Sequence, residues 1–121
     1  MVEHEDKIWV GTDGQMFLID VKTFQIINTW LAHSGLINDI ITVGKTIWSC
    51  SNDFSIAVWD SSNIEETQNI SAIKKLQGHS SKVHCLLNIG KFVLSGSFDL
   101  SIIIWDSQVF FFYFFFLIFL F

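Results

Sequence analysis

The sequence of 121 residues predicts an all-β protein built from repeated units of short antiparallel strands. Two observations support this. The segments 33–61 and 79–107 align without a gap at an offset of 46 residues, with twelve identities in twenty-nine positions. Short apolar, β-branched runs alternate with turn residues throughout, and no stretch shows a helical period. A fixed spacing of this length indicates an array of similar structural units.

Each copy contains the same strands in the same order. Gly44 and Gly90 mark turns between strands, as do the tight turns at 52–53 and 98–99. The segment 63–69 is the one polar, charged loop. The expected strands are, in order, a weaker copy at Lys7–Asp20, then Gln25–Leu31, Leu36–Val43, Lys45–Ser51, Ser55–Asp60, Ala72–Leu76, Lys82–Ile89, Lys91–Ser97 and Ser101–Asp106. Four antiparallel strands in about forty residues describe one blade of a β-propeller.

The residues repeated at this offset resemble the WD-repeat β-propeller family. In the later copy the matching motifs are Gly78-His79, Ser95-Gly96-Ser97 before Asp99, and Ile104-Trp105-Asp106. The earlier copy matches nearly as well, with Ala32-His33, Ser49-Cys50-Ser51 before Asp53, and Val58-Trp59-Asp60. The weak first copy has neither the histidine nor the tryptophan. The resemblance covers roughly residues 7–107.

The resemblance implies an incomplete β-propeller of four-stranded antiparallel blades, followed by an aromatic, hydrophobic tail. The expected parts are an acidic N-terminus at 1–6, a degenerate first blade of three strands at 7–32, a second blade at 33–78, an incomplete third blade at 79–108 and the tail at 109–121. Propellers close with typically four to eight blades, and this chain supplies strands for about two and a half. We therefore expect further blades, in cis or in trans, to cover the exposed edges.

Serine, histidine and aspartate occur together in both copies, which is also the composition of a catalytic triad. The functional interpretation is acyl transfer, with histidine as the base. The structural interpretation, implied by the family, is a buried hydrogen-bonded tetrad that a tryptophan completes. Duplication favours the structural interpretation, because an enzyme needs one nucleophile whereas every blade needs its own brace. The two expected tetrads are His33, Ser49, Asp53 and Trp59, and His79, Ser95, Asp99 and Trp105.

Propellers of this family are similar in serving as platforms for protein partners, so we expect a non-catalytic interaction scaffold that binds a protein or peptide. The family's usual contact positions lie three and five residues after the histidine and directly before the turn aspartate. In this chain they give a candidate partner-binding face of Leu36, Asn38, Asn52, Lys82, His84 and Phe98. An exposed leucine and phenylalanine beside amides and a lysine form a typical hot-spot mixture.

Composition excludes several other classes of function. Seven lysines, no arginine and a net charge of −5 argue against nucleic-acid binding, which needs a clustered positive field. Two cysteines, Cys50 and Cys85, are too few for a disulfide framework and are expected to be small core residues in an intracellular, cytoplasmic protein. The histidines and cysteines lack metal-ligand spacing, so we expect no metal and no cofactor.

Two rival interpretations remain for the function of the chain. It is either part of a larger signalling protein, such as a phosphoinositide phosphatase, kinase or GTPase regulator whose catalytic part lies elsewhere, or a truncated or mis-spliced product without independent function. The degenerate opening copy resembles propellers attached to such enzymes. Upstream and downstream transcript sequence would separate these interpretations.

The tail at 109–121 contains eight of the thirteen phenylalanines. As a helix it would reach about 20 Å, whereas a membrane span needs about twenty apolar residues, so membrane insertion is not expected. The favoured interpretation is translated non-coding sequence outside the fold. A short hydrophobic anchor and a genuine strand of the third blade are the alternatives.

Overall fold

The computed structural model describes residues 1–62 and 70–117, with side chains described up to Phe110. The expected polar loop at 63–69 and the last four residues of the tail lie outside the described part. Every regular element described is a strand. They are β1 (Val2–His4), β2 (Lys7–Gly11), β3 (Asp13–Asp20), β4 (Ile26–Val43), β5 (Thr46–Ser51), β6 (Ile56–Asp60), β7 (Lys74–Leu76), β8 (Val83–Ile89), β9 (Phe92–Ser97), β10 (Ser101–Asp106) and β11 (Phe111–Leu117).

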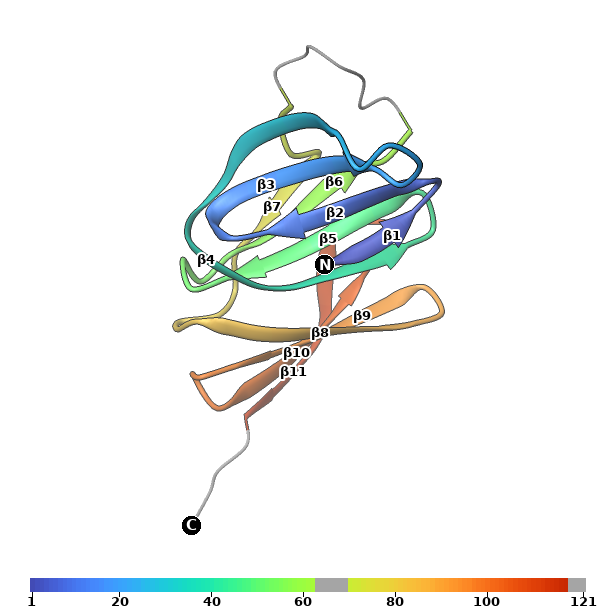
Figure 1. Ribbon diagram of the computed structural model, residues 1–121. Helices are drawn as coiled ribbons and strands as arrows, with labels where there is room; N and C mark the ends of the chain where they lie inside the picture. The colour runs from blue at the N-terminus through green and yellow to red at the C-terminus, as the bar shows by residue number, and fades with distance from the viewer. Residues whose placement is uncertain (63–69, 118–121) are drawn as a thin grey trace.

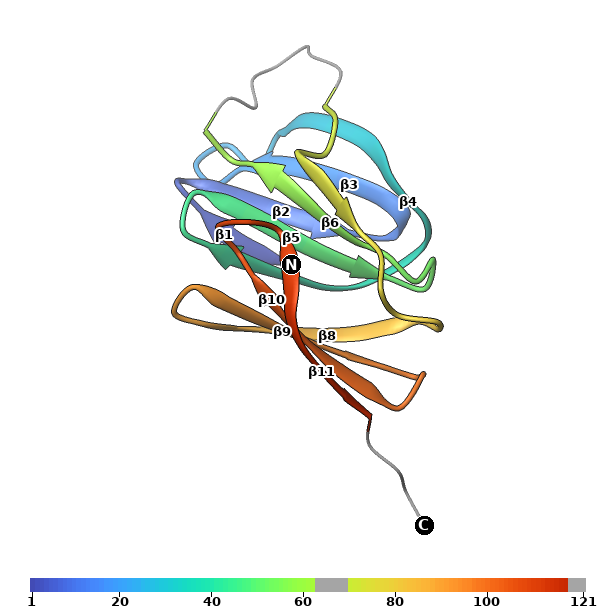
Figure 2. The same ribbon diagram turned by 180° about the vertical axis from the view of Figure 1, so that it is seen from behind.

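The strands form two antiparallel sheets that cross face to face (Figures 1 and 2). One sheet has seven strands in the order β1 to β7, and the other has four in the order β11-β10-β9-β8. The larger sheet comprises two blades, because β4 is 18 residues long and serves both. Its first half pairs with β3 and its second half with β5. Blade one is therefore β1, β2, β3 and the first half of β4; blade two is the second half of β4 with β5 to β7; blade three is β8 to β11.

Both terminal segments differ from the expectation that they lie outside the blades. Val2–His4 pairs with β2 as the inner strand of blade one, and Val2 packs on the core beside it. Phe111–Leu117 pairs with β10 as the outer strand of blade three. In each case the neighbouring strand offers a free row of backbone donors and acceptors, which even a short or highly aromatic segment can satisfy. The described strands thus form three four-stranded blades rather than about two and a half.

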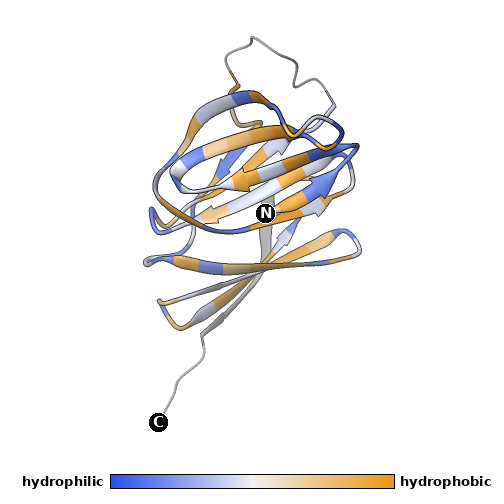
Figure 3. Cartoon of the chain, viewed as in Figure 1, coloured by the Kyte–Doolittle hydropathy of each residue, from blue (hydrophilic) through white to orange (hydrophobic). Residues whose placement is uncertain are grey.

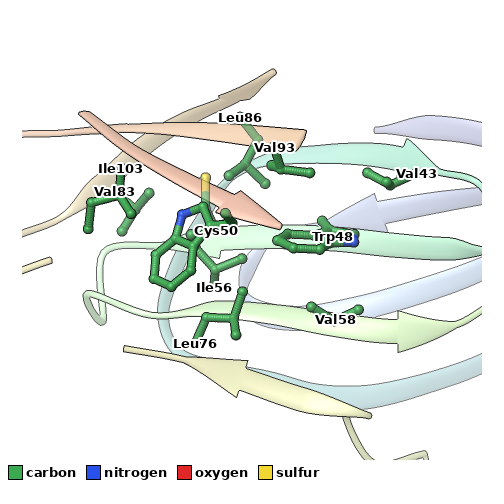
Figure 4. Close-up of a cluster of buried hydrophobic side chains, with 11 residues drawn as sticks. Val43, Trp48, Cys50, Ile56, Val58, Leu76, Val83, Leu86, Val93 and Ile103 are labelled. Atoms are coloured by element: carbon green, nitrogen blue, oxygen red, sulfur yellow. The ribbon is translucent and has the colours of Figure 1, made fainter. Parts of the chain in front are cut away.

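Two apolar cores lie between the blades. The core between blades one and two is built on Trp9, Met16 and Leu18 from one side and on Ile47 and Trp59 from the other. Eleven buried residues form the core between blades two and three, which Figure 4 shows in close-up: Val43, Trp48, Cys50, Ile56, Val58, Leu76, Val83, Leu86, Val93, Ile103 and Trp105. Blade two therefore lies between two neighbours and is buried on both faces.

Burial along the strands follows from this layering. β6 is buried at four successive positions, as expected of a strand covered on both faces. In β10, buried positions alternate with half-buried ones, because blade three has a neighbour on one face only. Apolar residues nevertheless line much of β8 and β10, as the hydropathy colours in Figure 3 show. The outer face of blade three is thus apolar without being covered.

Candidate functional site

A buried network connects the strands of blade two at the entrance to the blade. His33 lies in β4, Ser49 in β5 and Trp59 in β6, and Asp53 lies in the β5–β6 turn. The indole N–H of Trp59 donates to Ser49 Oγ at 3.0 Å, and Ser49 Oγ lies 2.8 Å from His33 Nε2. His33 Nδ1 lies 2.9 Å from the carboxylate of Asp53. The four residues predicted as a tetrad are in direct contact.

The network of blade three repeats this geometry closely. The indole of Trp105 donates to Ser95 Oγ at 2.8 Å, and Ser95 Oγ lies 2.7 Å from His79 Nε2. His79 Nδ1 lies 2.8 Å from the carboxylate of Asp99. The side chains of His79 and Asp99 are 1% and 7% exposed. The second predicted tetrad is therefore also assembled, and is almost entirely shielded from water.

The hydrogen-bond pattern assigns the protons within the blade-two network. The indole N–H of Trp59 can only donate, so Ser49 Oγ accepts from it. The carboxylate of Asp53 can only accept, so His33 Nδ1–H donates to it. Burial lowers the pKa of His33 below its usual value, against the opposing attraction of Asp53. For Asp53, burial acts to raise the pKa, but hydrogen bonds from Ser55 and His33 lower it overall.

Sequence reasoning missed a fifth member of each network. Ser55 Oγ donates to Asp53 at 2.6 Å and lies 3.2 Å from His33 Nδ1. Ser101 contacts Asp99 and His79 in the same way. Both serines are buried and both align at the offset of 46, so their identity in the two copies was the available signal.

These serines also hold the turns that precede β6 and β10. Phe54 and Leu100 directly follow the turn aspartates and have φ angles of 76° and 67°, which bulky residues rarely adopt. The neighbouring aspartate accepts a backbone hydrogen bond from Ser55 N or Ser101 N at 2.9 Å in each turn. The network thus stabilises a turn conformation that the local sequence alone disfavours.

Four of the six candidate partner-binding residues are exposed. Leu36 is 45% and Phe98 55% exposed, and Lys82 and His84 are exposed beside them. The rings of His84 and Phe98 contact each other with centroids 3.9 Å apart. The backbone N–H of Phe98 donates to the carbonyl of Lys82 at 3.0 Å, which fixes the turn against the start of β8. Lys82, His84 and Phe98 therefore form an exposed edge on blade three, and Leu36 is exposed on β4, in the part that belongs to blade two.

The other two candidates, Asn38 and Asn52, are half-buried and engaged within the chain. The Asn38 amide donates to Asn52 Oδ1 and to the carbonyl of Val83, both at 2.8 Å. The second of these bonds crosses from blade two to blade three. Beside it, Asp39 Oδ2 accepts from the backbone N–H of Leu86 at 2.9 Å. Asn38 thus links adjacent blades as well as lying at the predicted face.

The two cysteines differ in environment. Cys50 is buried in the core between blades two and three, where burial raises the pKa of its thiol. Cys85 is exposed, so the expectation that it is a core residue was wrong. The pairing of β8 with β9 is irregular between Val83 and Cys85, and Cys85 lies on the uncovered face of blade three.

Within the described part of the chain, no three histidine, cysteine or acidic side chains lie close enough to hold a metal ion. The described residues also include no helix suited to crossing a membrane.

Comparison with known proteins identifies the repeat. The family model described as "WD domain, G-beta repeat" matches residues 70–106, which span the outer strand of blade two and most of blade three. Residues 70–106 therefore match one WD40 repeat. The strands of the chain form an incomplete WD40 β-propeller, as the sequence predicted.

Solved structures agree on the fold. The chain superimposes on the WD40 β-propeller domain of Doa1 with a TM-score of 0.78 at 20% identity, over 94% of this chain and 37% of that one. It superimposes on a chain of the Mitotic Checkpoint Complex with a TM-score of 0.77 at 25% identity, over 91% of this chain and 34% of that one. This chain therefore corresponds to about a third of each structure.

Curated relatives match over shorter segments. The probable serine/threonine-protein kinase pats1 of Dictyostelium discoideum is 32% identical over 62 residues, which are 51% of this chain and 2% of that protein. The nuclear distribution protein PAC1 of Lachancea thermotolerans is 40% identical over 48 residues, which are 40% of this chain and 10% of that protein. The chain spans a small part of the length of both relatives. The WD40 fold supports a role in protein interaction.

Proposed function

We propose that these WD40 blades act as a non-catalytic scaffold that binds a protein or peptide partner through the edge formed by Leu36, Lys82, His84 and Phe98. The observation that carries the proposal is the exposed contact between the rings of His84 and Phe98. A large aromatic side chain that is held in place yet half exposed can bury much surface in a partner at little cost in conformational entropy.

The backbone around this edge supports the proposal. The backbone N–H of Phe98 donates to the carbonyl of Lys82, and that of Asn52 donates to the carbonyl of Leu36 at 2.9 Å, so hydrogen bonds hold the backbone at three of the four exposed residues. Preorganised contact residues lose less freedom on binding. Lys82 is exposed and its backbone is bonded to that of Phe98, and a lysine in this position favours a partner segment with an apolar residue next to an acidic one.

The buried networks support a non-catalytic role for the blades. Ser49 and Ser95 are fully buried, and the oxygen of each already accepts a hydrogen bond from an indole. A nucleophile must reach the substrate carbonyl, whereas these hydroxyls face only protein. In this proposal the tetrads keep the blade entrances rigid, and the exposed edge nearby makes the contacts.

Quantitative affinity capture tests the proposal. Tagged wild-type protein is compared in cells with Phe98→Ala and His84→Ala, and with Phe24→Ala as the control, because Phe24 is 72% exposed on a different turn. We expect a common set of partners to be lost from the first two variants and retained by the control. Equal recovery of all partners by the three variants would contradict the proposed edge.

A second candidate function is that the blades belong to a large multidomain signalling protein. The observation that favours it is the match to a probable kinase, of which the matched segment is only 2%. In that case any catalytic activity lies outside the residues described here, and the scaffold brings a partner to it. Transcript sequencing across both ends tests this candidate against a truncated, mis-spliced product, since an open frame into a catalytic domain is expected only for the former. In both cases the small number of cysteines supports an intracellular location.

A further inference from the structure

Each blade uses equivalent positions to pack against its neighbours. In blade one the cross-strand pair Trp9 and Leu18 faces blade two, and in blade two the equivalent pair Trp48 and Val58 faces blade three. In blade three the same positions pair Leu94 with Ile104. The face of blade three that carries this pair is therefore equivalent to the face through which blade two contacts its neighbour.

This open face of blade three is apolar and uncovered. Leu87 and Ile89 are each 56% exposed, whereas the residues aligned with them in blade two, Ile41 and Val43, pack into the core. The open face comprises Cys85, Leu87, Ile89, Leu94, Ile102 and Ile104. An end blade that faces water permanently is expected to be polar on its outer side, and this one is not.

Blade one has a complementary open face at the other end of the array. The pair Ile8 and Ile19 is equivalent to the pair Ile47 and Trp59 of blade two, which packs against blade one. The cross-strand pair Val10 and Phe17 lies two positions further along the same strands and therefore on the same face. All four residues are apolar and half-buried. Blade three thus exposes the surface with which a blade contacts the blade that follows it. Blade one exposes the surface with which a blade contacts the blade that precedes it.

We propose that two copies of this chain associate head to tail, so that the open face of blade three in each copy packs on the open face of blade one in the other. Such a heterologous contact formed twice closes a ring of six blades, which lies within the range of closed propellers. Charge favours the same arrangement. The β1–β2 turn carries Glu5 and Asp6, and the equivalent β8–β9 turn carries Lys91, whose ammonium lies 3.4 Å from Asp106 Oδ2 but whose side chain is 49% exposed. In the proposed contact the half-exposed Lys91 lies on the same side as the acidic turn.

The first test is the mass of the full chain in solution, measured by size-exclusion chromatography with light scattering. We expect twice the 13.9 kDa of one chain, independent of concentration over a wide range. Leu87→Asp is expected to halve this mass, and Phe24→Asp to leave it unchanged, because Phe24 lies on the β3–β4 turn outside both faces. A wild-type monomer, an open-ended series of larger species, or a Leu87→Asp dimer would each overturn the proposal.

A second variant distinguishes the head-to-tail contact from a symmetric one. Ile8→Asp blocks only the blade-one face, so it too should be monomeric, and mixing it with Leu87→Asp should restore a dimer through the one intact pair of faces. If blade three instead packed on blade three of the other copy, Ile8→Asp would remain dimeric and the proposal would fail. The mixture also controls for misfolding, since an unfolded variant could not restore the dimer.

Cys85 provides an internal reporter for the same interface. Cys50 is buried and its pKa is raised by burial, so Cys85 is the thiol expected to react with a maleimide in the folded chain. We expect Cys85 to be labelled in the Leu87→Asp monomer and to lose this labelling in the wild-type dimer. Equal labelling of both would show that the open face of blade three lies outside the contact.

Discussion

Replacing His79 with alanine tests the structural role of the tetrads directly. The change removes the contacts of the imidazole with Asp99, Ser95 and Ser101, and leaves a cavity inside blade three. Asp99 keeps the hydrogen bond from the backbone N–H of Ser101, so its buried carboxylate loses one hydrogen-bond donor but is not left without any. One charge-assisted and one neutral buried hydrogen bond, together with the cavity, give an expected loss of about 2–4 kcal/mol in the free energy of unfolding.

Urea unfolding followed by tryptophan fluorescence measures this loss, since Trp105 is buried beside His79. The matched control is His84→Ala in the same blade, which removes an exposed histidine and should change stability by less than about 0.5 kcal/mol. If His79→Ala and His84→Ala unfolded at the same urea concentration, the tetrad would not brace the blade. The interpretation of the serine and histidine as structural would then have to be abandoned.

Three further outcomes follow from the same geometry. Trp105→Phe keeps an aromatic ring but removes the indole N–H bonded to Ser95, so we expect a loss of about 1–2 kcal/mol in the same urea assay. Burial acts to raise the pKa of Asp99, but hydrogen bonds from Ser101, Ser80 and His79 outweigh it and lower the pKa to about 2. This group therefore stabilises the fold fully above its unfolded pKa of 3.8, and stability should fall as the pH is lowered from there toward 2; Asp99→Asn should be less stable at neutral pH and lack this part of the acid dependence. Gly11→Ala would place a Cβ 2.6 Å from Ile37 Cγ2 in the core between blades one and two, and thermal melts should show a loss of about 1–3 kcal/mol.

The tetrads were predictable from the sequence because they are duplicated. Two copies of a histidine, serine, aspartate and tryptophan at identical spacing cannot be explained by one catalytic site, and the hydrogen bonds occur as that argument requires. The strands were predictable for a similar reason, since β6 and β10 are apolar runs between turns. A residue pattern that repeats within one chain can be recognised without comparison to other sequences.

The remaining features depend on neighbours that a single strand does not reveal. Asn38 occupies a contact position of the family, but its amide reaches the carbonyl of Val83 because blade three packs beside it. Cys85 reads as a core residue, yet it lies on the one face of blade three that no described blade covers. The pairing of β11 depends on the free edge of β10 rather than on any turn signal. Each of these is decided by tertiary contacts rather than by local sequence.

The length of β4 has a consequence for how the protein folds. One unbroken strand contributes backbone hydrogen bonds to β3 and to β5, so blade one cannot lose its outer strand without straining the inner strand of blade two. Blade three has no strand in common with them and depends on side-chain packing and a few interblade hydrogen bonds. The cooperative units of unfolding therefore need not coincide with the repeats. We therefore expect the first seven strands to open as one unit in hydrogen exchange, with the boundary in amide protection between Leu76 and Val83.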